Sequence, residues 1–182
     1  MLGVMSAELP VVGQAPPPRN PVGPYRICVV CLGNICRSPT AEVLLRDELE
    51  RAGLDGKVVV ESAGTGDWHV GDPMHPGARA ELERHSLDGS GHTARRIERS
   101  WLADYDLLLA MDRRNLASLR QMAADDPDLT GRIQLMLSFD PEAMDWAEVP
   151  DPYEGSPEEF GAVFDMLLPA SRAVASQLAE ML

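Results

Sequence analysis

The chain alternates short apolar runs with segments in which apolar residues recur every three or four positions. Four runs are short and rich in β-branched or large aliphatic residues: "RICVVC" at 26–31, "KVVVES" at 57–62, "YDLLLAM" at 105–111 and "RIQLML" at 132–137. Short continuous apolar runs of this kind are typical of strands that are buried on both faces. We therefore expect four buried strands.

The first helical segment lies between residues 38 and 53. Ser38 and Pro39 are a typical N-cap and first helical residue. Gly53 is a typical residue at which a helix stops. Between these signals the apolar residues fall on one helical face, at Ala41, Leu44, Leu45, Leu49 and Ala52.

Further helical segments are predicted at 77–85, 97–104 and 113–124, and a C-terminal helix is predicted to end near residue 180. Asp112 is the expected cap of the 113–124 helix. The last helix should begin after a capping box, because its first residues read Ser156-Pro157-Glu158-Glu159.

Strands that alternate with helices predict one α/β domain, built on a four-stranded parallel twisted sheet with helices on both faces. In such sheets ligands bind beside the carboxyl ends of the strands. Four segments leave those ends, at 31–38, at 62–75, at the start of the Asp112 helix and at 138–156. A functional site should therefore combine residues from several of these segments.

Residues 1–24 differ from the rest of the chain. The stretch "QAPPPRNPVGP" is rich in proline, and no periodic apolar face is visible there. This composition predicts a flexible N-terminal extension with some polyproline II character. The folded domain is then expected to occupy residues 25–182.

Composition excludes several classes of protein. The 182 residues are 45% hydrophobic, which suits one core. The net charge of −13 argues against a nucleic-acid binder and against docking to an anionic membrane. The three cysteines all lie between residues 28 and 36, which does not suit a disulfide scaffold. Without a signal-peptide or transmembrane pattern, we expect a reduced cytoplasmic protein.

The loop at 31–38, "CLGNICRS", could bind a metal, act as a redox pair or bind an anion. Structural zinc usually needs four ligands, often as two close pairs, and no second pair exists. A redox pair is usually C-x-x-C and does not require Arg37. The anion hypothesis accounts for every residue, because backbone N–H groups converge where a strand leads into a helix. We expect a phosphate-binding loop after the first strand, formed by Leu32, Gly33, Asn34, Ile35, Cys36, Arg37 and Ser38.

Individual residues of the loop suit this role. Gly33 permits a tight turn, and Asn34 tolerates left-handed backbone geometry. Arg37 can bind two oxygens of a tetrahedral oxyanion. Cys31 would then lie beneath the anion, and thiols in such electropositive surroundings are ionised near neutral pH. Ser38 could donate a further hydrogen bond to the sulfur, so Cys31 is expected to be a nucleophile.

The stretch "VCLGNICRSPTAE" resembles the signature of the low-molecular-weight protein tyrosine phosphatases. The segments "VESAGTGDWHVG", "GHTARR", "AMDRRN" and "VPDPY" resemble family segments in the family order, so the similarity extends over residues 25–182. The resemblance implies hydrolysis of phosphotyrosine and small aryl phosphates through a phosphocysteine on Cys31. Arg37 is then the phosphate clamp and Asp151 the general acid and base, with no metal and no cofactor.

The same resemblance implies roles for other residues. Trp68 and Tyr153 would form aromatic walls around the substrate ring, and Cys36 could form a reversible disulfide with Cys31. Asn34, Ser38, Ser62 and His92 would brace the phosphate loop. Glu154 stands where many relatives have a second tyrosine, which puts regulation by tyrosine phosphorylation there in doubt. The expected partners are phosphotyrosine-containing proteins, and not nucleic acid, membranes or metals.

Three alternatives remain for the function. A protein arginine phosphatase on the same scaffold tends to have threonine where this chain has Ile35. An arsenate reductase needs resolving cysteines farther along, and none follows Cys36. A non-catalytic phosphate-binding module would lack a nucleophile or an acid, whereas both Cys31 and Asp151 are present.

Overall fold

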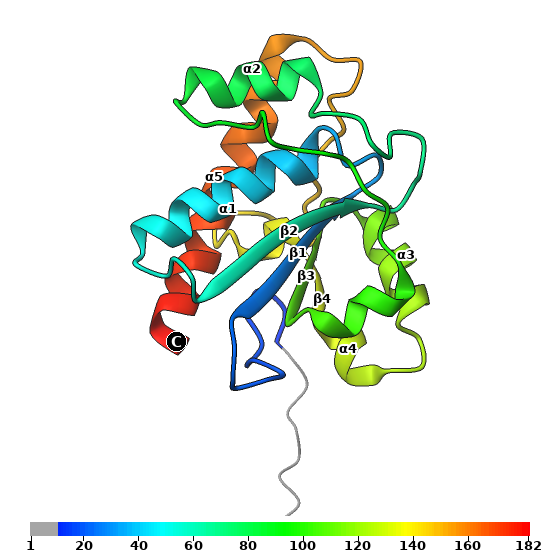
Figure 1. Cartoon of the computed structure of the whole chain (residues 1–182), viewed down its shortest axis with the longest axis vertical. Helices are drawn as coiled ribbons and strands as arrows, with labels where there is room; N and C mark the ends of the chain where they lie inside the picture. Colours follow the sequence, from blue (N-terminus) through cyan, green and yellow to red (C-terminus); the bar gives the residue numbers. More distant parts are fainter. Residues whose placement is uncertain (1–10) are drawn as a thin grey trace, which may run out of the picture.

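The structure of the protein is a computed structural model that describes residues 11–182. Its centre is one sheet of four parallel strands in the order β2-β1-β3-β4 (Figure 1). The strands are β1 Tyr25–Cys31, β2 Val58–Gly64, β3 Leu107–Ala110 and β4 Ile133–Leu135. The predicted four-stranded parallel sheet is thus confirmed.

Helices lie on both faces of this sheet. One layer contains α1 and α5, which pack against each other, with α2 beside α5 (Figure 1). The other layer contains α3, α4 and the 3₁₀ helix η1. The bounds are α1 Arg37–Arg51, α2 Pro76–Arg84, η1 Arg99–Asp104, α3 Arg113–Met122, α4 Pro127–Gly131, η2 Met136–Phe139 and α5 Pro157–Met181.

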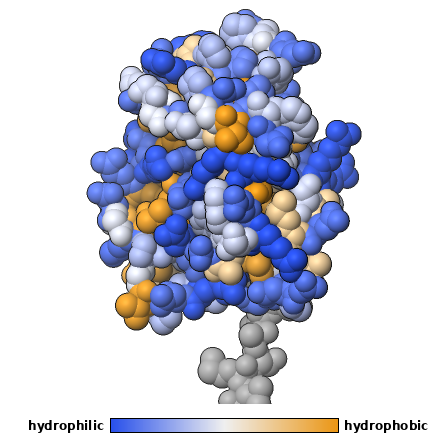
Figure 2. Space-filling model, turned by 45° about the vertical axis from the view of Figure 1, so that its right-hand side comes forward, coloured by the Kyte–Doolittle hydropathy of each residue, from blue (hydrophilic) through white to orange (hydrophobic). Residues whose placement is uncertain are grey.

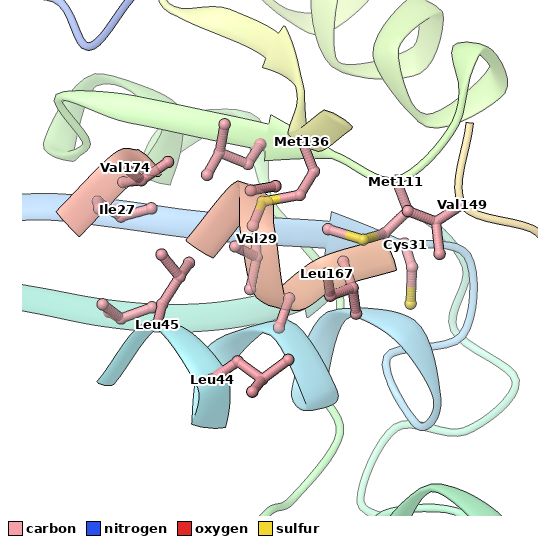
Figure 3. Packing of buried hydrophobic residues seen from close by; sticks show 14 of the residues in the cluster. Ile27, Val29, Cys31, Leu44, Leu45, Met111, Met136, Val149, Leu167 and Val174 are labelled. Atoms are coloured by element: carbon pink, nitrogen blue, oxygen red, sulfur yellow. The ribbon is translucent and has the colours of Figure 1, made fainter. Parts of the chain in front are cut away.

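Strand β1 supplies both halves of the core. Ile27, Val29 and Cys31 belong to the cluster on the α1–α5 side, whereas Cys28 and Val30 belong to the cluster on the α3–α4 side. This alternation follows from the two-residue period of a strand. Figure 3 shows Cys31 at the end of β1, with its sulfur pointing toward the loop that leads into α1.

Some local predictions were confirmed. Gly53 follows α1 with a left-handed φ of 74°. Asp112 caps α3 by accepting a hydrogen bond from Asn115 N at 2.8 Å. Ser156 and Glu159 form the expected capping box of α5.

Other local predictions were wrong. Helix α1 begins at Arg37, and the Ser38 side chain does not cap it. The segment predicted as a helix at 97–104 is mostly the 3₁₀ helix η1. The run at 132–137 gives only a three-residue strand before η2 begins, because η2 turns to pack on α5. The short helix α4, which buries Leu129, was not predicted.

The first ten residues of the predicted N-terminal extension lie outside the described residues, but residues 11–19 lie against the domain. Gln134 accepts a hydrogen bond from Gly13 N at 2.7 Å and donates one to Gln14 O at 3.0 Å. Gln177 likewise accepts from Ala15 N at 2.8 Å and donates to Gly13 O at 3.0 Å. A proline-rich segment in polyproline II conformation forms no regular hydrogen bonds within itself. Its backbone N–H and C=O groups are therefore available to bond with the glutamine side chains of the domain.

The surface shown in Figure 2 is mostly hydrophilic, with apolar residues scattered among the polar ones. None of the helices within residues 11–182 combines the length and the apolar character needed to cross a bilayer.

Candidate active site

The segment 31–38 lies at the carboxyl end of β1, in the middle of the sheet. After β1 the chain forms β2 on one side of β1, and it later forms β3 on the other side. This is the switch point at which open α/β sheets bind ligands. The loop after β2, the start of α3 and the segment before α5 reach the same place, as expected.

The carbonyl groups of the loop are turned away from its centre. Four of them accept hydrogen bonds from outside the loop: Leu32 from Gly66 N at 2.9 Å, Asn34 from His92 Nε2 at 2.6 Å, Ile35 from His75 N at 2.8 Å and Cys36 from Thr40 Oγ1 at 2.7 Å. All peptide bonds described are trans, and a trans peptide directs its N–H opposite to its C=O. The N–H groups that follow these carbonyls therefore face the inside of the loop.

Asn34 and Gly33 shape this turn in different ways. Asn34 has the predicted left-handed conformation, with φ 57°. Gly33 is not left-handed. An added Cβ at Gly33 would lie 3.0 Å from His69 Cδ2, so the His69 ring would have to shift slightly. The close approach of the two loops thus favours a small residue at position 33.

The Cys31 sulfur lies inside the loop and is buried. Asn34 N donates to Cys31 Sγ at 3.3 Å, and Ser38 Oγ lies 3.0 Å from the same sulfur. The Asn34 side-chain amide donates to Ser38 Oγ at 3.0 Å, so the single hydroxyl proton of Ser38 can point at the sulfur or at Ala63 O, which is 3.4 Å away. Two hydrogen-bonding groups thus lie beside the Cys31 sulfur.

Arg37 is buried at the start of α1 and is held from two sides. Its Nη1 donates to Asp112 Oδ2 at 2.6 Å and to Val149 O at 3.1 Å, and its Nη2 donates to Asp151 Oδ2 at 3.2 Å. Its Nε is buried and has no partner among residues 11–182. Burial works against the charge, but Cys31 and the two carboxylates outweigh it and raise the pKa of Arg37.

A chain of hydrogen bonds braces the loop from behind. The Asn34 amide also donates to Ser62 Oγ at 2.9 Å, and Ser62 in turn donates to the carboxylate of Glu42. The Asn34 side-chain oxygen accepts from Arg95 N at 2.8 Å. Every polar atom of the Asn34 amide is therefore satisfied, which fixes its orientation.

His92 contacts the loop through its ring. Because a carbonyl only accepts, the Nε2 that lies 2.6 Å from Asn34 O must carry the proton. Burial lowers the pKa of His92, although the hydrogen bond to Asn34 opposes this effect. The ring is thus neutral near pH 7 and acts as a fixed donor.

A cavity of about 260 Å³ opens above Cys31 and Arg37. Its walls include Trp68, His69 and Tyr153, which come from the loop after β2 and the segment before α5. Trp68 is 73% exposed and Tyr153 is 46% exposed, so both form the rim of what we call the active-site cavity. Asp151 lines the cavity beside them.

Cys36 also lines the cavity, and it is buried. Burial, followed by the charges of Cys31 and Asp151, raises the pKa of Cys36 to about 12. The three cysteines are unpaired. In the described part of the chain, no three His, Cys, Asp or Glu side chains gather closely enough to hold a metal ion.

The structure adds three residues to the predicted site. Glu42 orients Ser62, Asp112 holds Arg37 with the carboxylate that also caps α3, and His69 packs on the phosphate loop. The pattern around 38–53 places Glu42 only on a helix, and no local signal links it to Ser62. His69 lies next to Trp68 within the segment "VESAGTGDWHVG", and this position could have indicated that His69 belongs to the site.

Comparisons with known proteins agree with this geometry. The sequence profile of the family described as "Low molecular weight phosphotyrosine protein phosphatase" matches residues 26–182. A low molecular weight protein-tyrosine-phosphatase of Streptomyces coelicolor is 40% identical over 86% of this chain and 94% of its own length. YfkJ of Bacillus subtilis, with the same description, is 44% identical over 70% of this chain and 80% of its own length.

A solved structure shows the same fold. The protein tyrosine phosphatase of Entamoeba histolytica superposes with a TM-score of 0.80 at 29% identity, covering 86% of this chain and 97% of that protein. The family profile covers residues 26–182, and these relatives and the solved structure cover 70% to 86% of the chain. The chain therefore belongs to the low-molecular-weight phosphotyrosine protein phosphatase family.

Proposed function

We propose that this enzyme hydrolyses phosphotyrosine in proteins through a phosphocysteine intermediate on Cys31. The observation that carries the proposal is the surroundings of the Cys31 sulfur. The sulfur lies within the ring of inward-facing N–H groups and close to Ser38 Oγ. Nearby, the Nε of Arg37 is buried and has no partner among the described residues. These donors suit a phosphoryl group above a thiolate.

In the first step the Cys31 thiolate attacks phosphorus, and the bond to the tyrosine oxygen breaks. Asp151 supplies the proton that the leaving phenolate takes up. In the second step Asp151 takes a proton from water, the water oxygen attacks phosphorus, and the P–S bond breaks. Inorganic phosphate leaves, and the Cys31 thiolate is restored.

Positive charge for both steps comes from the loop N–H groups and Arg37. Phosphoryl transfer depends mainly on positioning and on stabilisation of charge over the equatorial oxygens. Asp112 and Val149 hold Arg37 Nη1, and Asp151 accepts one N–H of Nη2. The Nε–H and the second N–H of Nη2 are proposed as the edge that binds two phosphoryl oxygens. Asn34, Ser38, Ser62 and His92 keep the ring in shape, as proposed from the resemblance.

Trp68 and Tyr153 are proposed to enclose the aromatic ring of the substrate. Both line the cavity above Cys31 and are partly exposed. A slot with aromatic sides suits the long, flat phosphotyrosine side chain better than the short phosphoserine. Ile35 also lines this cavity, where it presents an apolar surface and no hydroxyl group to a guanidinium. This favours an aryl ester over a phosphoarginine.

The decisive experiment compares substrates and variants. Wild-type protein should hydrolyse p-nitrophenyl phosphate and phosphotyrosine peptides, Cys31→Ser should be inactive, and phosphotyrosine proteins should remain bound to Cys31→Ser when it is added to a cell extract. Faster hydrolysis of phosphoarginine peptides would identify an arginine phosphatase instead. Absence of turnover with every phosphate ester would favour a non-catalytic module.

We also propose that Cys36 protects Cys31 from irreversible oxidation. Peroxide converts the Cys31 thiolate to a sulfenic acid, the Cys36 sulfur attacks it, and water leaves as the disulfide forms. Cys36 follows Cys31 on the same tight loop and lines the same cavity. Mass spectrometry after mild peroxide should detect a peptide linked through both residues, and its absence would remove this role.

The cytoplasm is the compartment that we propose for the enzyme. A thiolate nucleophile works in a reducing environment, and all three cysteines are unpaired. Fractionation of the native cell should recover the enzyme with cytoplasmic markers, and recovery with secreted proteins would contradict the proposal.

A further inference from the structure

A second cavity adjoins the active-site cavity, on the side of α3. It has a volume of about 450 Å³, and its walls include Leu32, Gly66, Trp68, Ser118 and Met122. We call it the flanking groove. Leu32 and Trp68 also line the active-site cavity, so the two spaces share a wall.

Trp68 forms the partition between them. Its ring lies directly over Gly66, where an added Cβ would be 2.0 Å from Trp68 Cζ3. Gly66 N donates to Leu32 O at 2.9 Å, which fixes this loop to the phosphate loop. The indole thus lines both spaces and is 73% exposed.

We propose that the flanking groove binds an uncharged apolar side chain next to the phosphotyrosine of the substrate protein. This inference rests on the proposed function. Neighbouring residues of an extended peptide are about 3.3–3.6 Å apart along the chain, so a residue one or two positions away reaches a space that shares a wall with the active-site cavity. Leu32, Trp68 and Met122 offer such a side chain apolar contact, and the uncharged Thr65, Ser118 and Gln121 line the rest of the groove together with Gly66 and Arg99.

Arg99 and Arg96 each form an exposed ion pair with an aspartate, which partly offsets their attraction for an acidic substrate residue. Arg99 lines the groove, but its Nη2 is 2.7 Å from a carboxylate oxygen of Asp125. Arg96 is similarly paired with Asp67, next to Trp68, at 3.5 Å. An acidic substrate residue would compete with these carboxylates and would also face a net charge of −13.

Peptide kinetics test this inference. Phosphotyrosine peptides in a Gly-Ser background would carry Leu, Ala, Asp or Lys at each of the two positions before and after the phosphotyrosine. At one of these positions Leu should raise kcat/KM about tenfold over Asp, the discrimination that an apolar pocket typically provides. Equal rates for all four residues at every position, or a preference for Asp or Lys, would overturn the inference.

Variants of α3 then locate the preference. Ser118→Phe fills the groove and should abolish the preference for Leu while leaving hydrolysis of p-nitrophenyl phosphate unchanged, because that ester has no flanking residue. Ala117→Phe is the matched control, because Ala117 is exposed on the same helix and does not line the groove. Met122→Ala, which removes wall rather than adding bulk, should weaken the preference as well.

The outcomes separate the two proposals. A preference for Leu that survives both Ser118→Phe and Met122→Ala would exclude the groove as its origin, although the enzyme remained a tyrosine phosphatase. Failure of the wild-type protein to hydrolyse p-nitrophenyl phosphate and all of the peptides would overturn the proposed function itself.

Discussion

Asp151 holds its carboxylate at the rim of the active-site cavity with one hydrogen bond to each oxygen. Oδ2 accepts from Arg37 Nη2 at 3.2 Å, and Oδ1 accepts from Tyr153 N at 3.2 Å. The side chain is 43% exposed, so it can exchange protons with water between the two steps. A residue that donates and then removes a proton needs both the fixed position and this access.

Replacement of Asp151 tests the acid and base role. Asp151→Asn keeps the shape of the side chain but cannot transfer a proton, so turnover of a phosphotyrosine peptide should fall roughly 10²–10⁴-fold. Steady-state kinetics measure the loss. Glu154→Gln is the control, since it removes a neighbouring exposed carboxylate and should change the rate less than about twofold. An unchanged rate in Asp151→Asn would assign the proton transfer to another group.

Ser38 provides a second test at the scale of one side chain. Its hydroxyl lies 3.0 Å from Cys31 Sγ, and a hydrogen bond to a charged group contributes about 1.5–3 kcal/mol. Ser38→Ala should therefore slow alkylation of Cys31 by iodoacetamide at pH 7 by about tenfold or more. A thermal melt of the variant confirms that the fold is kept. Alkylation at the wild-type rate would mean that the hydroxyl does not stabilise the thiolate.

Some helices, turns and strands could be predicted from their own sequence, and others could not. Short-range signals were sufficient where a residue acts on its own neighbours, as in the left-handed turn at Asn34, the capping box at Ser156 and the stop at Gly53. The parallel sheet followed from the apolar runs, since strands buried on both faces have no polar side. These features depend on local chemistry, and so the sequence alone was enough to predict them.

Long-range contacts could not be predicted in the same way. Ser38 makes the predicted contact with the Cys31 sulfur and not the predicted N-cap, and its sequence pattern allowed both. Gly33 was predicted as a turn residue, but its lack of a side chain also leaves room for His69, which approaches from the loop after β2. For Gly33 the reason lay in a segment distant in sequence. The resemblance to the family, rather than periodicity, supplied Asp151 and Trp68.

Gly66 tests how the loop after β2 shapes the active-site cavity. An added Cβ there would lie 2.0 Å from the Trp68 ring, so Gly66→Ala must displace the indole. In its proposed role the Trp68 ring contacts substrate in both the ground state and the transition state, so KM for aryl phosphates should rise several-fold with little change in kcat.

Two controls support this reading of Gly66. Gly91→Ala places a methyl group in a loop position with no other atom within 4 Å, and it should have no effect. Adding Gly66→Ala to Trp68→Ala should cause little further loss, because the two changes act on one wall. Equal KM values for the wild type and Gly66→Ala would show that the indole does not contact the substrate ring.

At the scale of the whole molecule, His92 links stability to pH. Its pKa is lowered in the folded protein, and its ordinary value is about 6.5. Between these two values the unfolded chain binds more protons, so stability rises with pH. The contribution of neutral His92 is complete above about pH 6.5 and is lost as the pH falls through the folded value.

A comparison with His92→Gln isolates this contribution from the many carboxylates. The free energy of unfolding, measured with urea, should exceed that of the variant by the largest margin above pH 7. The margin should shrink toward pH 5, where unfolding is favoured by protonation of His92. A margin that stays constant or grows on acidification would contradict the lowered pKa.

The N-terminal segment contributes to the stability of the whole domain through Gln134 and Gln177. Gln177 joins α5 to residues 13–15 by two hydrogen bonds, and a neutral hydrogen bond contributes about 0.5–1.5 kcal/mol. Gln177→Ala should therefore lower the free energy of unfolding by about 1–3 kcal/mol and speed proteolysis near residue 13.

Gln14→Ala is the matched control, because the Gln14 side chain is exposed and only its backbone oxygen bonds to the domain. If both variants unfold at the wild-type urea concentration, residues 11–19 do not stabilise the domain, because the entropy lost in ordering them offsets their hydrogen bonds.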